Sequence, residues 1–403
     1  MKSWKARTLL FFLSQSITLF GSQIVQMAVV WYVTLHTGSG AWVAVFSVCS
    51  YLPQFFLSFW GGVWADRFCR KWLIIGADAW IAAVTLCMMV LMPCLSSGSV
   101  LLAALLGMSL IRSAGAGIQT PAVNAVIPTL VPAESLMRYN GINAMMQSAV
   151  QFAAPAAAAV ILTASTLHFT LALDLLTAVL GIGLLALIPL PIQERTQHAP
   201  SVWPDLKAGA QYACASRTIL HLLTVYGLFV FLTVPAGYLS GLLVSRVYGD
   251  TYWHLTAAEL SGFGGMLVGG LLMSLWSGFK KRHFTLSAGL ALFGAASIAM
   301  GVVRHFPVYL VFMALHGIAL TSVQTTLTTM QQEAADPSMH GRVFGLMSSL
   351  YASCYPIGMA LFGPLADRVP LPWMMVGSGA VLLLLAGMTV RFFQQRLSNV
   401  KIY

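Results

Sequence analysis

Long apolar segments alternate with short polar segments from one end of this chain to the other. Each apolar run continues for about 20 residues or more, the length that an α-helix needs to cross the hydrocarbon core of a bilayer. Strands of a membrane β-barrel would instead alternate apolar and polar residues over about ten positions. We predict twelve membrane-spanning helices, at residues 9–35, 41–64, 73–93, 99–121, 140–163, 168–190, 218–245, 256–277, 284–303, 306–330, 343–366 and 371–392.

The composition agrees with this pattern. Hydrophobic residues make up 58% of the chain and charged residues only 8%, and the mean hydropathy is +0.82. Too few polar residues remain to cover a soluble protein of this length, so the predicted fold class is an all-α integral membrane protein. The first segment follows Lys2, Lys5 and Arg7 as a signal peptide would, but its apolar run is too long, and we expect it to remain as the first helix.

Lys and Arg residues lie almost entirely on one side of the predicted membrane. The favoured side carries seventeen of them, whereas the other side carries Arg246, Arg304 and Arg368. Because cytoplasmic loops accumulate Lys and Arg, we predict that both termini are cytoplasmic. The net charge of +10 is then a sign of topology. No loop combines clustered basic residues with aromatic residues over a useful length, so we expect no nucleic-acid partner.

A long polar connection divides the chain into two parts with six predicted spans each. We place an N-terminal half at residues 1–190, a Pro-containing cytoplasmic connection at 191–217 and a C-terminal half at 218–403. The halves resemble each other weakly, since Pro155 in the fifth span corresponds to Pro356 in the eleventh. Parallel six-helix repeats around a central cavity are used by transporters.

One charged motif lies between the second and third spans and identifies a family. The residues Gly62, Asp66, Arg67, Arg70 and Lys71 are spaced as in the signature loop of the major facilitator superfamily, which the chain resembles over nearly its whole length. Cys69 stands where that family usually has Gly, which predicts a less permissive turn. The resemblance implies twelve helices in two pseudo-symmetric halves.

Two further segments resemble the drug-exporting members of this family. They are the Arg-and-Gly element from Arg112 to Gly117 and the longer run to Pro132, which is similar to the macrolide-efflux branch. This resemblance implies proton-driven export of amphiphilic molecules, macrolide-type antibiotics first among them, across the bacterial inner (cytoplasmic) membrane. Related exporters of siderophores share much of this pattern.

The charged motif suggests a gate. Asp66 is placed to face the N-terminal end of the eleventh helix, whose positive dipole favours a carboxylate. Such a contact would hold the two halves together on the cytoplasmic side. The alternative is that the motif only anchors the positive-inside topology.

Four ionisable residues inside spans are candidates for proton coupling. Each costs roughly 2.5–3.5 kcal/mol at a helix centre on insertion scales and therefore needs a partner or a task. Depth along the helices makes a pair between Asp78 and Arg112 possible. Asp174 has no depth-matched cation in its own half, so it is the leading candidate to take up and release a proton. Glu259 is a further candidate, with solvation at the interface as the alternative.

A polar stripe on the first span predicts part of a substrate cavity. Gln15, Thr18, Ser22 and Gln26 lie within about 80° on a helix of 3.6 residues per turn, and lipid would reject such a face. We expect it to face the interior. The other predicted cavity residues are Gln23, Met27, Gln119, Met146, Gln147, Gln151, Tyr226, Phe229, Gln324, Tyr351 and Tyr355.

Other classes of function fit the sequence less well. It contains no Gly-rich nucleotide-binding loop, so we predict neither an enzyme nor a primary pump, and no cofactor beyond the proton gradient. The six cysteines have no metal-ligand spacing, so we expect no metal. The expected partners are an amphiphilic small molecule, protons and the lipid bilayer, and we expect a monomer. The alternatives are siderophore or metabolite transport, including import, and a channel or membrane receptor.

Overall fold

The structure is a computed structural model that describes residues 4–95, 98–132, 136–189, 211–276, 278–336 and 340–400. These residues form long helices, and no strand occurs among them. They divide into two compact units, the first within residues 1–36 and 46–200 and the second within residues 37–45 and 201–403. Most of the predicted connection at 191–217 lies outside the described residues.

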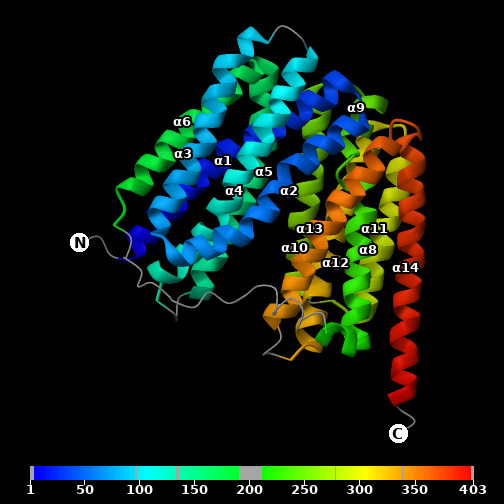
Figure 1. Ribbon diagram of the computed structural model, residues 1–403. Helices are drawn as coiled ribbons and strands as arrows, with labels where there is room; N and C mark the ends of the chain where they lie inside the picture. The colour runs from blue at the N-terminus through cyan, green and yellow to red at the C-terminus, as the bar shows by residue number, and fades with distance from the viewer. Residues whose placement is uncertain are drawn as a thin grey trace. The chain divides into compact units, whose positions relative to one another are not determined.

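The described part of the first unit contains six long helices, which run side by side (Figure 1). Their bounds are α1 (Trp4–Thr37), α2 (Gly40–Arg67), α3 (Arg70–Leu91), α4 (Gly98–Leu130), α5 (Leu136–Ala164) and α6 (Leu167–Ala186), with a short 3-10 helix, η1 (Met92–Cys94), after α3. By its packing, the connection between α1 and α2 belongs to the second unit.

The described part of the second unit also contains six long helical segments, one of which is broken by a turn (Figure 1). Their bounds are α8 (Arg217–Gly237), α9 (Ser240–Val247), α10 (Tyr252–Trp276), α11 (Arg282–Val302), α12 (Phe306–Ala334), α13 (His340–Leu365) and α14 (Leu371–Val400). The helices α8 and α9 together correspond to the seventh predicted span.

The helices match the predicted membrane spans. Among the described residues, eleven helical segments are long and apolar enough to cross a bilayer, and α13 supplies the twelfth long helix. Proline occurs inside α2, α4, α5, α8 and α13. Helices in membranes tolerate proline because neighbouring groups satisfy the freed carbonyls.

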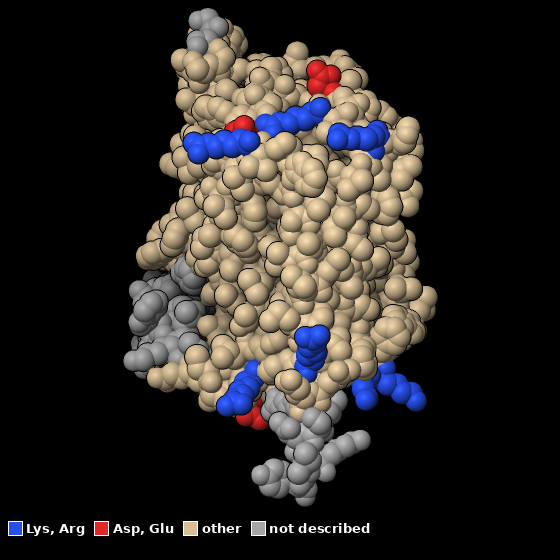
Figure 2. Space-filling view, turned by 90° about the vertical axis from the view of Figure 1, so that its right-hand side faces the viewer, with Lys and Arg blue, Asp and Glu red and all other residues tan. Residues whose placement is uncertain are grey.

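The surface is apolar where lipid would touch it. On the face that Figure 2 shows, Lys and Arg lie in two groups, and a broad band without visible charged side chains separates them. Large apolar side chains are widely exposed, as Leu275 at 86% illustrates. Tryptophans near helix ends, including Trp72 and Trp373, are exposed in the way that aromatic residues at membrane interfaces are.

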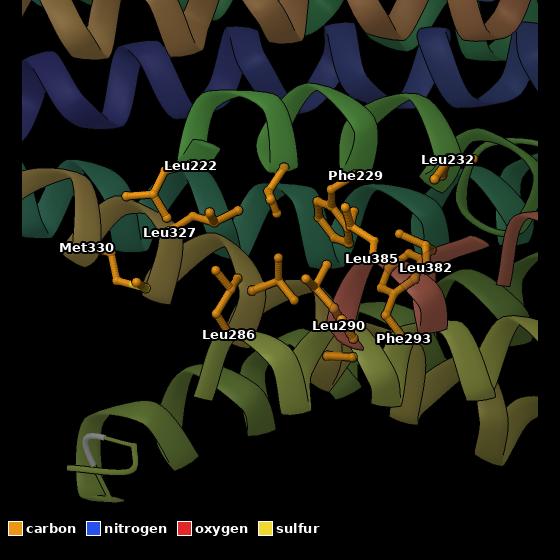
Figure 3. Packing of buried hydrophobic residues seen from close by; sticks show 14 residues of the cluster. Leu222, Phe229, Leu232, Leu286, Leu290, Phe293, Leu327, Met330, Leu382 and Leu385 are labelled. Carbon is orange, nitrogen blue, oxygen red and sulfur yellow. The ribbon is translucent and has the colours of Figure 1, made fainter. Parts of the chain in front are cut away.

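Each unit has its own hydrophobic core. In the first unit, buried residues of α1, α3, α4 and α6 pack together, among them Phe11, Ile74 and Val126. In the second unit, apolar residues of α8, α11, α12 and α14 interdigitate (Figure 3). There Phe229 packs edge-to-face on Phe293, with ring centroids 5.0 Å apart. These cores keep the helices of each unit in register.

Candidate transport site

A buried ion pair lies inside the first unit. The Arg112 guanidinium of α4 donates to the carboxylate of Asp174 on α6 and to Thr85 Oγ1 on α3. Thr85 Oγ1 also donates to Asp174 Oδ2 over 3.0 Å, and Arg112 Nη2 donates to Ser22 Oγ on α1 over 3.3 Å. Asp174 is 3% exposed. We call these four residues the ion-pair layer, and it joins four helices.

This pairing corrects two sequence-based predictions. Arg112 pairs with Asp174 and not with Asp78, and Asp174 therefore has a cation in its own unit. The prediction was wrong because it measured depth from the loop ends and treated the helices as straight and parallel. The observed contacts place Arg112 level with Thr85, which is seven residues beyond Asp78 on α3.

The ion-pair layer requires α1 and α6 to approach closely, and glycine allows this. A Cβ atom on Gly21 would lie 1.9 Å from Thr177 Oγ1 and 3.1 Å from Asp174 Oδ1. A Cβ atom on Gly181 would lie 2.2 Å from Thr18 Cγ2. Small residues commonly permit such contacts between membrane helices. Gly21 and Gly181 therefore position the backbone that presents Asp174.

A second polar layer lies seven residues along α1, α3 and α4 from the ion-pair layer. Gln119 Nε2 of α4 donates to Asp78 Oδ1 on α3 over 3.1 Å and to Gln15 Oε1 on α1 over 3.3 Å. Asp78 is 5% exposed, and its Oδ2 atom has no hydrogen-bond partner among the described residues. We call Gln15, Asp78 and Gln119 the amide layer. The predicted polar stripe of α1 thus faces the interior of the first unit.

A small cavity opens beside the ion-pair layer within the first unit. Its volume is about 90 Å³, and α1, α2, α3 and α4 contribute to its lining. Its polar lining residues include Gln26, Ser50, Gln54, Ser109 and Arg112. The guanidinium is already paired with Asp174, so it brings no net charge to the cavity wall.

Sequence reasoning identified only part of this lining. Gln26 was predicted, whereas Ser50, Gln54 and Ser109 were missed. A signal was available on α2, because Ser50 and Gln54 are one helical turn apart and form a short polar stripe. The Gln54 N–H donates to Ser113 Oγ of α4 over 3.0 Å, which joins this stripe to the neighbouring helix.

The other predicted cavity residues of the first unit lie elsewhere. Gln23 and Met27 are half-buried on α1 but do not line this cavity. Met146 packs against the hydrophobic core. Gln147 and Gln151 are exposed on α5.

In the second unit, the prediction that Phe229 lines a cavity is wrong, and the other cavity residues remain predictions. Phe229 is 1% exposed and belongs to the hydrophobic core (Figure 3), so it is no cavity wall. Tyr226 packs against the same core. The rings of Tyr351 and Tyr355 stack with centroids 6.0 Å apart. Gln324 is exposed on α12, and Glu259 is partly buried two turns into α10.

The basic end of the charged motif fastens helices of the first unit together. Lys71 Nζ donates to the carbonyl oxygens of Ala186 and Ile188, each over 2.8 Å, at the end of α6. A cation there complements the negative end of the helix dipole. Arg70 donates to the carbonyl oxygens of Ala65 on α2, over 2.9 Å, and Ala125 on α4, over 2.6 Å. These two residues therefore do more than set the topology.

The turn in this motif is shorter than predicted. The helix α2 continues to Arg67 and α3 begins at Arg70, so only two residues separate them. Cys69 has φ −63° and ψ 111°, an extended conformation that does not require glycine. The side-chain surroundings of Gly62, Asp66 and Arg67 lie outside the described residues, and the contact expected between Asp66 and the eleventh helix stays a prediction.

In the second unit, Asp367 holds the connection between α1 and α2. Its carboxylate accepts hydrogen bonds from Ser39 Oγ (2.7 Å), Gly40 N (2.6 Å), Ala41 N (3.0 Å) and Arg246 Nη2 (2.8 Å). Burial acts to raise the pKa of Asp367, but these hydrogen bonds outweigh it and lower the pKa from 3.8 to about 2. The carboxylate thus caps the first turn of α2.

The described residues contain no cluster of three or more His, Cys, Asp or Glu side chains that would hold a metal ion. The six cysteines are free thiols. The polar groups of the two layers and of the cavity are amides, hydroxyls, carboxylates and one guanidinium.

Comparisons with known proteins identify the family. The model of the Major Facilitator Superfamily matches residues 11–358. Macrolide efflux protein A of Streptococcus pyogenes is 30% identical over 398 residues, which cover 95% of each chain. Multidrug efflux pump Tap of Mycobacterium bovis is 24% identical over 362 residues, which cover 87% of this chain and 85% of the relative.

A solved structure agrees in fold. The crystal structure of a bacterial homologue of the iron transporter ferroportin, in an inward-facing state, has a TM-score of 0.71 at 18% sequence identity. The likeness covers 96% of this chain and 99% of that one. Together with the helix pattern and the family match over most of its length, this places the chain in the major facilitator superfamily.

Proposed function

We propose that this transporter exports amphiphilic small molecules from the bacterial cytoplasm in exchange for protons, and that macrolide antibiotics are its first substrate class. The observation that carries this proposal is the similarity to a macrolide efflux protein over 95% of both chains. The similarity to a multidrug efflux pump supports a wider range of amphiphilic substrates.

The interior of the first unit supports coupling to protons. Two carboxylates, Asp78 and Asp174, are buried in spans where each has a substantial cost. Buried ionisable residues in transporters mark ion pathways and proton relays. The pair formed by Arg112 and Asp174 also joins α4 to α6, so these helices would move together during transport.

The cavity beside Arg112 supports an amphiphilic substrate. Its polar lining consists of amides and hydroxyls around a neutralised guanidinium, next to Val25, Val29 and Ile81. Its volume of about 90 Å³ is well below the roughly 300–1,000 Å³ of sites for drug-sized ligands. We therefore assign it to one polar group of the substrate, with a hydrogen bond from the amide of Gln26 or Gln54.

The proposed orientation places both termini in the cytoplasm. Within the second unit, Arg217 and Lys280–Arg282 lie at one set of helix ends, and Arg391 lies nine residues before α14 ends on that side. Arg246, Arg304 and Arg368 lie at the other set of helix ends. The more basic end is the cytoplasmic one by the positive-inside rule. Cysteine substitution at Lys281 and at Arg304, followed by labelling with a membrane-impermeant maleimide on intact cells, tests this. The six native cysteines are first replaced by serine, because they are free thiols, and labelling at Arg304→Cys alone is then expected.

The export proposal is tested in a drug-sensitive bacterium that expresses the chain. The wild type should raise resistance to macrolides and lower their accumulation, and a protonophore should abolish the difference. Arg112→Ala and Asp174→Asn should lose most of the resistance. Glu333→Gln is the matched control, because its carboxylate is exposed at the end of α12 and pairs only with Arg282 among the described residues.

Other results would redirect the assignment. Unchanged macrolide susceptibility with clear efflux of a siderophore would favour the metabolite-exporter alternative. Accumulation in right-side-out vesicles under an inward proton gradient would indicate import. Solute flux that ignores collapse of the pH gradient and the voltage would contradict proton coupling and favour a channel.

A further inference from the structure

The two polar layers of the first unit repeat with the same spacing on every helix that they share. Gln15 and Ser22 on α1, Asp78 and Thr85 on α3, and Arg112 and Gln119 on α4 are each seven residues apart. Seven residues are about two turns and span roughly 10.5 Å along a helix. The layers are therefore related by one axial step, with a single carboxyl group in each.

The fourth helix distinguishes the two layers. On α6, Asp174 supplies the carboxylate of the ion-pair layer, and seven residues later Gly181 occupies the level of the amide layer. Ser14 Oγ donates to the Gly181 carbonyl over 2.9 Å, so α6 offers only backbone there. The amide layer thus receives no ionisable side chain from α6.

The charge balance of the layers is opposite. In the ion-pair layer, the Asp174 Oδ2 atom accepts from Arg112 and from Thr85, so the carboxylate is compensated. In the amide layer, Asp78 has one hydrogen bond, from the neutral amide of Gln119, and its buried Oδ2 atom has no partner among the described residues. Burying an uncompensated carboxylate is costly, whereas the neutral acid avoids that cost.

The charged groups nearest Asp78 do not compensate it. On α3 itself they are Arg70 and Lys71, about two turns away, and both donate to backbone carbonyl oxygens. On α4 the only charged residue is Arg112, which is two turns away and pairs with Asp174. On α6 it is Asp174 itself, an anion. On α1 the residue of the amide layer is Gln15, which accepts a hydrogen bond from Gln119 and has no charge. Protonation of Asp78 would therefore relieve an imbalance that no described neighbour removes.

We propose that Asp78, which accepts a hydrogen bond from Gln119, is the group in the first unit that binds the transported proton, and that the Arg112–Asp174 pair does not bind it. The proton comes from water, forms an O–H bond at the unpartnered Oδ2 atom and later returns to water, so no other bond is made or broken. This inference rests on the proposed proton-coupled export and replaces Asp174 as the leading proton site.

A spectroscopic test does not depend on transport. The full-length protein in lipid nanodiscs is titrated while infrared difference spectra record the carbonyl stretch of protonated carboxylic acids. Glu259→Gln is introduced into every protein tested, because Glu259 is a partly buried acid of the second unit. In that background, a buried-acid band that titrates is expected with Asp78 present and in Asp174→Asn, and its loss is expected in Asp78→Asn. A titrating band that persists in Asp78→Asn, or that disappears only in Asp174→Asn, would overturn the assignment.

A transport test separates this inference from the proposed function. In proteoliposomes, Asp78→Asn should lose erythromycin accumulation driven by a pH gradient but keep exchange of labelled for unlabelled erythromycin. The near-isosteric amide keeps the acceptor for Gln119, and size-exclusion chromatography checks folding. Glu333→Gln should behave as the wild type in both assays.

The outcomes are distinguishable. If wild-type accumulation ignores the pH gradient, the proposed coupling fails whatever the infrared band shows. If accumulation depends on the gradient and Asp78→Asn still accumulates substrate, the coupling stands and Asp78 is not its proton site.

Discussion

Removing Arg112 should destabilise the protein through the carboxylate that it leaves behind. In Arg112→Met, the buried Asp174 keeps its hydrogen bond from Thr85 but loses its cation. Breaking a buried ion pair by removing one partner typically costs about 3–5 kcal/mol, because the remaining charge is uncompensated. Methionine retains much of the apolar volume, so the loss should come mainly from electrostatics. Unfolding free energies are measured by denaturant titration of the purified protein in detergent micelles.

The double variant supplies the decisive comparison. Arg112→Met with Asp174→Leu removes both charges, and replacing a buried pair by apolar residues is often neutral. We expect the double variant to regain most of the stability that Arg112→Met loses. Arg304→Met is the control, because Arg304 is exposed and surface substitutions usually fall within about ±0.5 kcal/mol. The reasoning would be refuted if the double variant lost as much unfolding free energy as Arg112→Met and Asp174→Leu lose in sum when measured singly, within about 0.5 kcal/mol.

Three further predictions follow from contacts described above. The hydrogen bonds of the Asp367 carboxylate should protect residues 38–42 from hydrogen exchange between neutral pH and about 3.8. This protection should be lost as the pH falls through about 2, since the pKa of Asp367 is lowered on folding. Asp367→Asn should lack the protection at every pH, and wild-type protection already lost at pH 5 would contradict the assignment. Gly21→Ala should cost roughly 1–3 kcal/mol by overpacking, whereas Gly107→Ala, with no atom within 4 Å of the new Cβ, should be neutral or slightly stabilising; equal melting temperatures would refute the close approach of α1 and α6. Lys71→Met should lower stability by about 0.3–1 kcal/mol through the lost contacts at the end of α6, and Lys281→Met, at an exposed position, should change it less; a larger effect at Lys281 would argue against the contact.

The sequence predicted the features that each segment encodes by itself. Twelve apolar runs of sufficient length specify twelve helices, because a bilayer admits few other structures. The inward direction of the α1 stripe was also predictable, since lipid rejects Gln15 and Thr18, and both are buried. The charged motif between the second and third spans was sufficient to identify the family.

Features that depend on how helices meet were not predictable from one sequence. The partner of Arg112 depends on the tilt and rotation of α3, α4 and α6, which residue counts along single helices do not contain. Phe229 was misplaced for a related reason, because an aromatic residue in an apolar span carries no sign of the side it faces. The pairs of glycines that bring α1 and α6 together become meaningful only once their opposing atoms are known.

The common seven-residue spacing has a mechanical consequence. A helix is stiff over two turns, so rotating α3 about its long axis swings Asp78 and Thr85 through the same angle. A rotation caused at one layer then moves the side chains of the other layer, roughly 10.5 Å away along the helix axis, without any side chains that connect the two layers. The helix backbone itself would transmit the rotation between the two layers, and α1, α3 and α4 would each do so within the first unit.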